Sequence, residues 1–171
     1  MANNVSNQIT FDAIHADNVF PFLQGPEECV DFNTLVPQPQ FESDEFGDKE
    51  TEWNWANWNT KWNAYECSCT VNDGKAIIRF QTAWSHPVSV IKAFADKFRI
   101  PFEHKFLDEL GNFWGIENWC EMGGVMVIVH ARNDNPDDLN PLCEELIKSQ
   151  WSEQERQAYA EFMEWRAQHG N

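Results

Sequence analysis

Four tryptophans lie within ten residues of this chain, and no other feature of the sequence restricts its fold as strongly. One indole buries roughly 150–250 Å² of surface, so this many indoles must cover part of a core or form a contact surface. The first interpretation makes the segment a turn and an aromatic cover for a sheet, and the sequence favours it. The second makes it an aromatic binding face, which includes Trp84 if the two segments lie together. The residues of that face are Trp53, Trp55, Trp58, Lys61 and Trp62.

The net charge restricts the partners of the chain. It has 28 Asp and Glu residues against 12 Lys and Arg residues, for a formal net charge of −16. Nucleic-acid binding requires a cationic surface that displaces counterions, and binding to an anionic membrane also requires basic residues. The composition therefore argues against both partners. It permits two interpretations: ordinary solubility through self-repulsion, which is the stronger one, or a surface that competes for a basic partner protein.

An acidic segment directly precedes the tryptophans. Residues 40–52 contain few apolar side chains, which predicts a solvated loop inserted into the domain. Ordinary surface is one interpretation of this loop. The other is a set of carboxylates that mimics nucleic-acid phosphates and competes for a basic site. The acidic residues concerned are Glu42, Asp44, Glu45, Asp48, Glu50 and Glu52.

Alternating and helical apolar patterns predict an α+β fold, with an antiparallel sheet and helices packed on one face. The clearest hairpin signal is Asp73-Gly74 between two alternating strands, and a second turn is expected at Gly123-Gly124. The clearest helix spans residues 87–98. The apolar run Val125–Val129 predicts a central strand buried on both faces. The remaining elements are strands at 4–13, 29–39, 65–71, 76–82, 102–110, 113–121 and 125–132, and a short helix within 12–23.

Residues 133–171 differ in character from the α+β domain predicted at residues 1–132. Ser152 and Glu155 form a capping box for a last helix, and Pro141 opens a shorter helix before it. We expect this two-helix extension to pack on its own sheet, and the protein to be a monomer or a weak dimer.

No pattern of catalytic or metal-binding residues stands out. The cysteine count of five is odd, so free thiols are expected. Cys67 and Cys69 could join Cys120 in a zinc site, but small apolar thiols are the stronger interpretation. His104 and His130 fall on neighbouring predicted strands and could meet. The sequence predicts no catalytic residue, no metal and no cofactor.

The chain shows no sign of membrane insertion or export. It has no apolar run of about 18 residues, the length of a membrane-spanning helix. Its first residues, MANNVSNQIT, lack the basic and apolar regions of a signal peptide. We therefore expect a cytoplasmic protein.

Four collinear motifs resemble one known family. They are N-x-x-x-N-x-I-T at 3–10, D-F-N-x-L-x-P-x-P at 31–39, W-N-T-K-W-N-A at 58–64 and T-A-W-x-x-P-x-x-V-I at 82–91. Over about residues 2–130 the chain resembles the YubB ferredoxin-like family of phage and plasmid proteins. The resemblance implies a ferredoxin-like fold, an origin in a mobile element and no enzymatic activity. That family usually has Gly where this chain has Asn59, and because Asn tolerates positive φ well we expect the turn to persist.

Charge and resemblance together favour a non-enzymatic protein that binds and inhibits a host defence protein, of the anti-CRISPR or anti-restriction type, through acidic mimicry of nucleic acid. Two alternatives remain open. One is a small-molecule or nucleotide-binding module on the tryptophan-rich face, and the other is an accessory protein of unknown role. A mimic should lose affinity as salt rises, whereas a bound small molecule should quench tryptophan fluorescence.

Overall fold

The six strands that the structure describes pair antiparallel in one sheet, in the order β2-β3-β1-β4-β5-β6. This computed structural model describes residues 3–25, 30–41 and 48–130, together with 161, 164 and 168. The strands are β1 (Asn4–Asp12), β2 (Tyr65–Asn72), β3 (Lys75–Ala83), β4 (Phe102–Asp108), β5 (Trp114–Met122) and β6 (Val125–His130). The helices are α1 (Ala16–Leu23), α2 (Asp48–Asn57) and α3 (Val88–Phe98), with 3₁₀ turns at Ala13–His15 and Phe32–Thr34.

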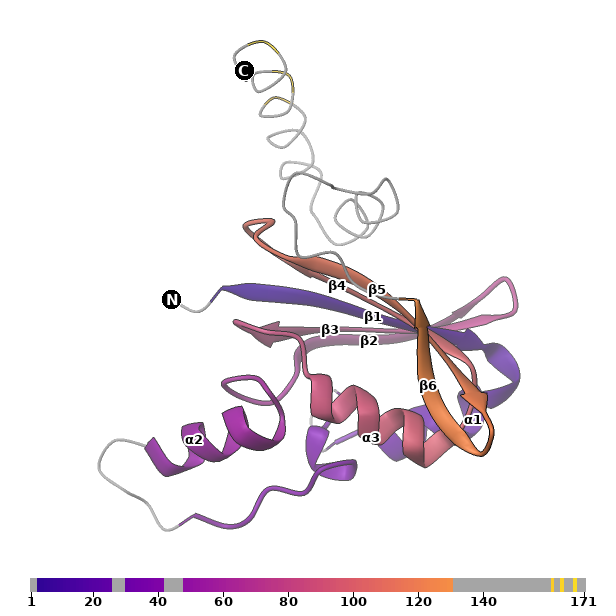
Figure 1. Ribbon diagram of the computed structural model, residues 1–171, viewed down its shortest axis with the longest axis horizontal. Helices are drawn as coiled ribbons and strands as arrows, with labels where there is room; N and C mark the ends of the chain where they lie inside the picture. Colours follow the sequence, from indigo (N-terminus) through magenta and orange to yellow (C-terminus); the bar gives the residue numbers. More distant parts are fainter. Residues whose placement is uncertain are drawn as a thin grey trace.

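The strand β1 forms the centre of a ferredoxin-like arrangement. It pairs with β3 on one side and with β4 on the other, and α3 connects these two neighbours along the chain (Figure 1). A ferredoxin-like fold has this strand order, β4-β1-β3-β2, with helices after β1 and after β3. The strands β5 and β6 extend the sheet beyond β4. The predicted α+β fold with a ferredoxin-like sheet is therefore confirmed.

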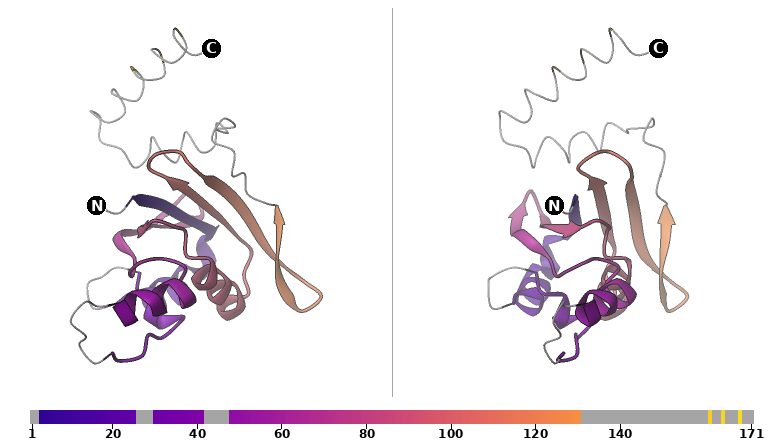
Figure 2. Two further views of the ribbon diagram at one scale, coloured as in Figure 1. Left: turned by 60° about the vertical axis from the view of Figure 1, so that its left-hand side comes forward. Right: turned by 90° about the vertical axis from the view of Figure 1, so that its left-hand side faces the viewer.

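The helices α1, α2 and α3 lie on one face of the sheet, as the turned views in Figure 2 show. The side chains of β1 alternate, so that Val5, Ile9 and Phe11 are buried beneath the helices. Phe94 of α3 packs against Phe102 of β4 with ring centroids 4.9 Å apart. Burying this face removes large aromatic area from water, at about 25 cal/mol per Å² of apolar surface, which drives the packing of helices on the sheet.

The opposite face of the sheet is polar where β1, β3 and β4 meet. Arg79 Nε donates to Gln8 Oε1 at 2.9 Å, and Gln81 Nε2 donates to Ser6 Oγ at 3.1 Å. Cross-strand pairs of this kind hold neighbouring strands in register. The alternation of β1 therefore separates a helix-covered face from a hydrogen-bonded polar face.

Two tight turns set the hairpin registers. Asp73 and Gly74 have φ of 48° and 74°, and Gly123 and Gly124 have φ of 61° and 86°. Positive φ at both central residues characterises the turns whose twist matches that of a hairpin, and glycine adopts it without strain. Both turns lie where the sequence predicts them.

The predicted strand at residues 29–39 is wrong. Val30 forms only an isolated bridge, and Phe32–Thr34 is a 3₁₀ turn. The carboxylate of Asp31 accepts hydrogen bonds from the backbone N–H and the side chain of Asn33, both at 2.9 Å. This local bonding gives the backbone an alternative to strand pairing.

The predicted acidic loop at 40–52 is wrong in its second half, because α2 begins at Asp48. Acidic residues in a first turn stabilise a helix by interacting with its dipole, so the same composition suits a helix N-terminus. Glu50 and Glu52 are exposed on this helix. The remaining acidic residues of the segment, Glu42, Asp44 and Glu45, lie outside the described residues.

The predicted central position of residues 125–129 is also wrong. These residues belong to β6, which is an edge strand of the described sheet. Val125 is 58% exposed and Ile128 is 43% exposed. An apolar run fits either a buried strand or an uncovered one, and periodicity alone does not separate them.

The C-terminal extension predicted at 133–171 lies outside the described residues, apart from three positions. Glu161, Glu164 and Gln168 are helical and exposed. The predicted boundary near residue 132 and the predicted packing of the extension stay predictions.

Candidate functional site

The tryptophan-rich segment divides into a buried part and an exposed part. Trp58 is 2% exposed, and its ring packs edge-on against Phe32 and Trp53, with centroids 5.6 and 5.4 Å away. Its indole Nε1 donates to the backbone oxygen of Val36 at 2.8 Å. Trp58 is therefore a core residue, in agreement with the favoured interpretation of the segment, and its inclusion among the candidate binding-face residues is wrong. Trp53 is half-buried beside it and also packs on Phe41.

Asn54 fixes the turn that follows α2. It is buried, and its side-chain Nδ2 donates to the backbone oxygen of Lys61 at 3.0 Å. Its Oδ1 accepts from Gln38 Nε2 at 2.6 Å, and its backbone oxygen accepts from the N–H groups of Trp58 and Asn59. A buried amide with its hydrogen bonds made holds both ends of a loop in one geometry.

The turn after α2 is joined to the segment that follows β3. Asn59 has φ of 67°, which confirms that this residue takes the positive φ expected of it. Its Nδ2 donates to Ser85 Oγ at 3.3 Å, and the backbone N–H of Lys61 donates to the oxygen of Ala83 at 3.5 Å. Two segments separated in sequence therefore form one surface.

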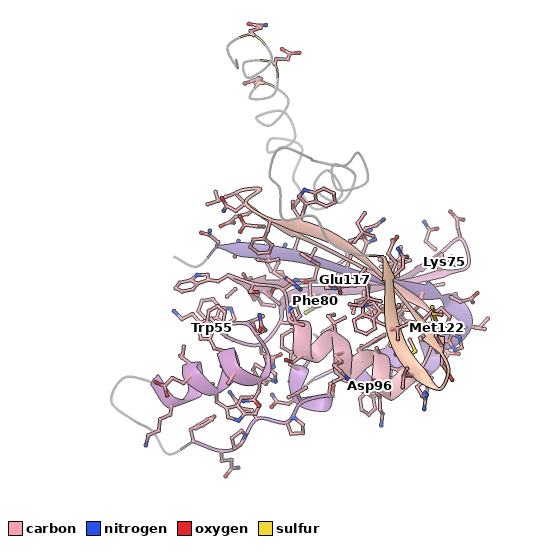
Figure 3. All side chains as sticks on the ribbon, viewed as in Figure 1. Trp55, Lys75, Phe80, Asp96, Glu117 and Met122 are labelled. Atoms are coloured by element: carbon pink, nitrogen blue, oxygen red, sulfur yellow. The ribbon has the colours of Figure 1, made fainter. Side chains whose placement is uncertain are left out.

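Four side chains meet on that surface, and we name them the indole–lysine patch: Trp55, Lys61, Trp62 and Trp84. Lys61 Nζ lies 5.2 Å from the ring centroid of Trp62 and 5.1 Å from that of Trp84. Both distances are within cation–π range. The rings of Trp55 and Trp84 are 6.1 Å apart, and Figure 3 labels Trp55 at this side of the molecule. Trp62 is 41% exposed and Trp84 is 47% exposed.

The backbone of Trp84 is held in an unfavourable conformation. Its φ is 72°, a region that bulky residues rarely adopt. Such a residue costs about 1–3 kcal/mol and persists only where its surroundings fix it. Its N–H donates to the oxygen of Asn3 at 2.8 Å, beside the first residue of β1. The backbone strain at Trp84 therefore lowers the stability of the fold, while the indole is exposed to solvent.

Tyr65 lies at the border of the patch and is held by a hydrogen bond to β1. The ring of Tyr65 lies 6.4 Å from Trp62, and its hydroxyl donates to Asn4 Oδ1 at 2.5 Å. Burial, with the nearby carboxylates of Glu66 and Glu109, raises the pKa of Tyr65 to about 12. The hydroxyl therefore stays protonated and remains a donor at neutral pH.

A second polar cluster lies inside the core, near the Glu117 and Phe80 labels of Figure 3. His104 is fully buried, with Nε2 3.1 Å from Asn7 Oδ1 and Nδ1 3.5 Å from Glu117 Oε2. Trp119 Nε1 also donates to Glu117 Oε2 at 3.3 Å. The predicted meeting of His104 with His130 is wrong, because β5 lies between the strands that carry them.

Burial and hydrogen bonding act in opposite directions on this cluster. Burial lowers the pKa of His104, and the contact with Glu117 offsets only part of that effect. For Glu117, burial favours the neutral acid, but the contacts with His104 and Trp119 leave its pKa below the ordinary value. The hydrogen bonds of the cluster satisfy side-chain polar groups within the core, which favours a structural role.

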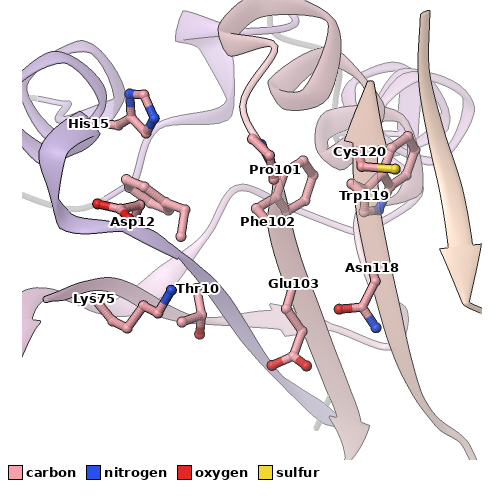
Figure 4. Close-up of a pocket in the computed structure, with 11 residues that line it drawn as sticks. Thr10, Asp12, His15, Lys75, Pro101, Phe102, Glu103, Asn118, Trp119 and Cys120 are labelled. Carbon is pink, nitrogen blue, oxygen red and sulfur yellow. The ribbon is translucent and has the colours of Figure 1, made fainter. Parts of the chain in front are cut away.

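A groove of about 570 Å³ opens at the end of the sheet, shown in Figure 4. Thr10, Glu103 and Asn118 face it from adjacent strands, where they are register partners. Asp12 and Lys75 add charges of opposite sign. No polar side chain that lines the groove is fully buried. The groove therefore indicates the class of a ligand less clearly than the indole–lysine patch does.

The cysteines do not form a metal site within the described chain. Cys67 is disulfide-bonded, which corrects the expectation of free thiols throughout, whereas Cys69 and Cys120 are free. Cys69 on β2 and Cys120 on β5 are four strand spacings apart, or roughly 19 Å. The alternative of a zinc site that joins them is therefore wrong. In the described residues no group of three metal-binding side chains gathers.

The fold defines a ferredoxin-like α+β domain, and the comparison with known families agrees. Residues 57–134 match the family model described as a ferredoxin-like domain in Api92-like protein. The match includes the turn with Lys61 and Trp62, together with Trp84, but not Trp55 or the acidic residues of α2. The resemblance to the YubB family itself stays a prediction.

Comparison with curated proteins and with solved structures found no match. None of the helices within the described ranges has the length and apolar composition of a membrane span.

Proposed function

We propose that this protein is a non-enzymatic binding protein whose partner is a protein with a basic surface. The observation that carries the proposal is the exposed indole–lysine patch beside the exposed carboxylates of α2. Trp55 belongs to the same helix as Glu50 and Glu52. The two features that sequence reasoning separated, aromatic face and acidic segment, therefore share one element.

The indoles would supply the affinity of such a contact. Tryptophan is enriched among the residues that dominate binding energy at protein interfaces. Trp62 and Trp84 are both large and exposed, and the turns that carry them are fixed by Asn54 and Asn59. A surface that is rigid before binding loses little conformational entropy on binding.

The acidic residues would supply steering and partner choice. A net charge of −16 attracts a basic partner over a distance. Added salt screens this attraction and therefore slows association. Lys61 lies between two indoles and would bind an acidic or carbonyl group of the partner, which fixes the orientation of the complex.

A host defence protein is the partner class that we propose, which makes the protein an inhibitor of the anti-CRISPR or anti-restriction type. Such targets bind nucleic acid in basic grooves, and an acidic protein can occupy a groove of that kind. The resemblance to proteins of phages and plasmids supports this choice.

The test is capture of the target from host lysate by the immobilised full chain, in parallel with Trp84→Ala and with Leu110→Ala. Leu110 is an exposed apolar residue of the β4–β5 turn, so it controls for loss of any exposed side chain. We expect one host protein to be retained at about 50 mM salt, to be reduced at about 500 mM, and to be lost with Trp84→Ala alone. Equal retention by both variants, or no salt dependence, would contradict the proposal.

A second candidate function rests on Lys61 and its two indoles. A cation between aromatic rings suits a ligand that combines a planar base with anionic phosphates, such as a nucleotide. Titration with ATP should quench tryptophan fluorescence in the wild type and leave Lys61→Ala unquenched, if this candidate holds. Absence of quenching in the wild type excludes it.

A further inference from the structure

Among the residues that the structure describes, no strand pairs with the outer edge of β6, which lies at the opposite side of the sheet from β2. Its sequence is VMVIVH, with no charged residue in its first five positions and no proline. Edge strands are usually blunted by charges, prolines or bulges, because their free backbone groups pair with other chains. From Val125 to Ile128, β6 has no charged residue, no proline and no shift in its register with β5; its one register shift comes after Ile128.

The register of the β5–β6 hairpin identifies the backbone groups that face outward. Met122 pairs with Val125 next to the two-residue turn, Glu121 with Met126, and Trp119 with Ile128. In such a hairpin the pair beside the turn exchanges hydrogen bonds, and alternate pairs do not. Met126 and Ile128 therefore present their N–H and C=O groups to the open edge, where no described strand pairs with them.

Apolar side chains accompany these backbone groups. Met122, Val125 and Ile128 are all large and exposed. Met126 instead packs against the core, which anchors the strand. Arg99, at the end of α3, donates to the backbone oxygen of Gly124 and lies 3.7 Å from Glu121. The hairpin is thus held in place, while no strand within the described ranges pairs with its outer edge.

The other edge of the sheet is protected. The register of β2 with β3 shifts between Tyr65 and Ser68, and Glu66 takes φ of 50° within that bulge. A bulge twists an edge away from the geometry that a further strand needs, and the charge of Glu66 adds to the effect. β6 also has a register shift, but it lies beyond Ile128, between the pairs of Trp119 with Ile128 and of Asn118 with His130. The regular stretch from Val125 to Ile128 is therefore the part of this edge that suits a further strand.

We propose that β6 is a strand-addition site, which binds an extended apolar segment of a partner protein flanked by basic residues. Backbone hydrogen bonds to Met126 and Ile128 would supply affinity, and the exposed apolar side chains would supply contact area. The charge of the chain selects the occupant: at −16 per copy, two copies repel each other, whereas basic flanks are attracted. Only this choice of a basic partner rests on the proposed function, since β6 and the patch are separate surfaces.

The probe is a synthetic peptide, Lys-Val-Thr-Val-Thr-Val-Lys, titrated into the isotopically labelled full chain at low salt. We expect amide shifts and slower hydrogen exchange at Met126 and Ile128, and at least about tenfold weaker binding of the same peptide with Glu in place of Lys. Ile128→Pro removes an outward N–H and should abolish binding. Val71→Pro is its counterpart on the β2 edge and should leave binding unchanged, because Val71 is also an exposed position outside the hydrogen-bonded pairs.

A second variant of Ile128 and two further measurements complete the test of the β6 site. If Ile128→Pro does not fold, Ile128→Lys keeps the backbone and adds a charge to the edge, and it should weaken peptide binding in the same way. Shifts at β2, or none at β6, overturn the proposal. A dimer in sedimentation that Ile128→Lys dissociates would show a second copy as occupant and would also overturn it. Trp84→Ala should bind the peptide normally, so failure here is distinguishable from failure of the proposed function.

Discussion

Trp58 and Trp84 are both indoles beside a turn with positive φ, yet their environments are opposite. Trp58 is buried with its Nε1 bonded to Val36, whereas Trp84 is exposed on a strained backbone. The indole of Trp58 stabilises the fold through burial, whereas the exposed indole of Trp84 is carried by a backbone conformation that destabilises it. The difference teaches that spacing within a tryptophan-rich segment does not identify the binding residues. The backbone and burial of each indole do.

The largest expected effect tests this contrast directly. Trp58→Ala should lower the free energy of unfolding by about 3–5 kcal/mol, because it removes a large buried side chain and leaves a cavity. Trp84→Ala should change it by less than about 1 kcal/mol, since exposed side chains contribute little. Guanidinium unfolding of both variants measures the difference. Similar losses in the two would show that the exposed half is also part of the core.

The next effect concerns the polar residue that supports the patch. Asn54→Ala should lower the free energy of unfolding by about 1–3 kcal/mol, because the partly buried backbone oxygen of Lys61 and the amide of Gln38 lose their partner. Asn57→Ala is the matched control, as Asn57 is half-buried and bonds only within its own helix. An equal effect of the two substitutions would contradict the role assigned to Asn54.

The buried histidine predicts a dependence of stability on pH. Burial lowers the pKa of His104, so below about pH 6.5 the unfolded chain binds a proton that the folded chain does not. Stability should fall as pH drops from about 6.5, by at most about 1.4 kcal/mol per pH unit from this residue. Below about pH 4.5 Glu117 should add a further loss, because its pKa is also lowered in the fold.

Unfolding at about pH 7.5 and at about pH 5.5 checks the histidine contribution. His104→Gln should retain less stability at the higher pH but lose less of it on acidification than the wild type. Parallel pH profiles for the two proteins would assign the acid sensitivity to other groups.

The smallest effect returns to the turn after α2. Asn59→Gly should raise stability by about 0.5 kcal/mol, because Gly takes φ of 67° with less strain, and the long bond to Ser85 contributes little. Asn57→Gly, at the last residue of α2, should lower stability instead. Loss of stability in Asn59→Gly would show that the bond to Ser85 outweighs the strain.

Much of the fold follows from local sequence signals. Asp73-Gly74 and Gly123-Gly124 predict their hairpins because positive φ at two successive residues demands such residue types. The helix α3 follows from its apolar spacing. α2 does not, because its tryptophans and asparagines give it no continuous apolar side, and its support comes from Gln38 and the turn beyond it.

The site was predictable only in part. Lys61 and Trp62 lie in the patch as expected, and Trp84 joins them as the sequence suggested, but nothing local separates Trp58 from them. Their separation arises from tertiary contacts with Phe32 and Val36. The open edge of β6 was hidden for a similar reason, since an apolar run has the same composition in a central strand and at an edge.

The central position of β1 has a consequence for how the chain reaches this structure. Both neighbours of β1 come much later in the sequence, as the contacts of Ser6 with Gln81 and of Asn7 with His104 span 75 and 97 residues. Hairpins such as β2–β3 need only nearby residues, whereas β1 must wait until β4 has been synthesised. Long-range pairing of this kind slows folding. We therefore expect recruitment of the first strand, and not formation of the hairpins, to limit the rate at which the sheet is completed.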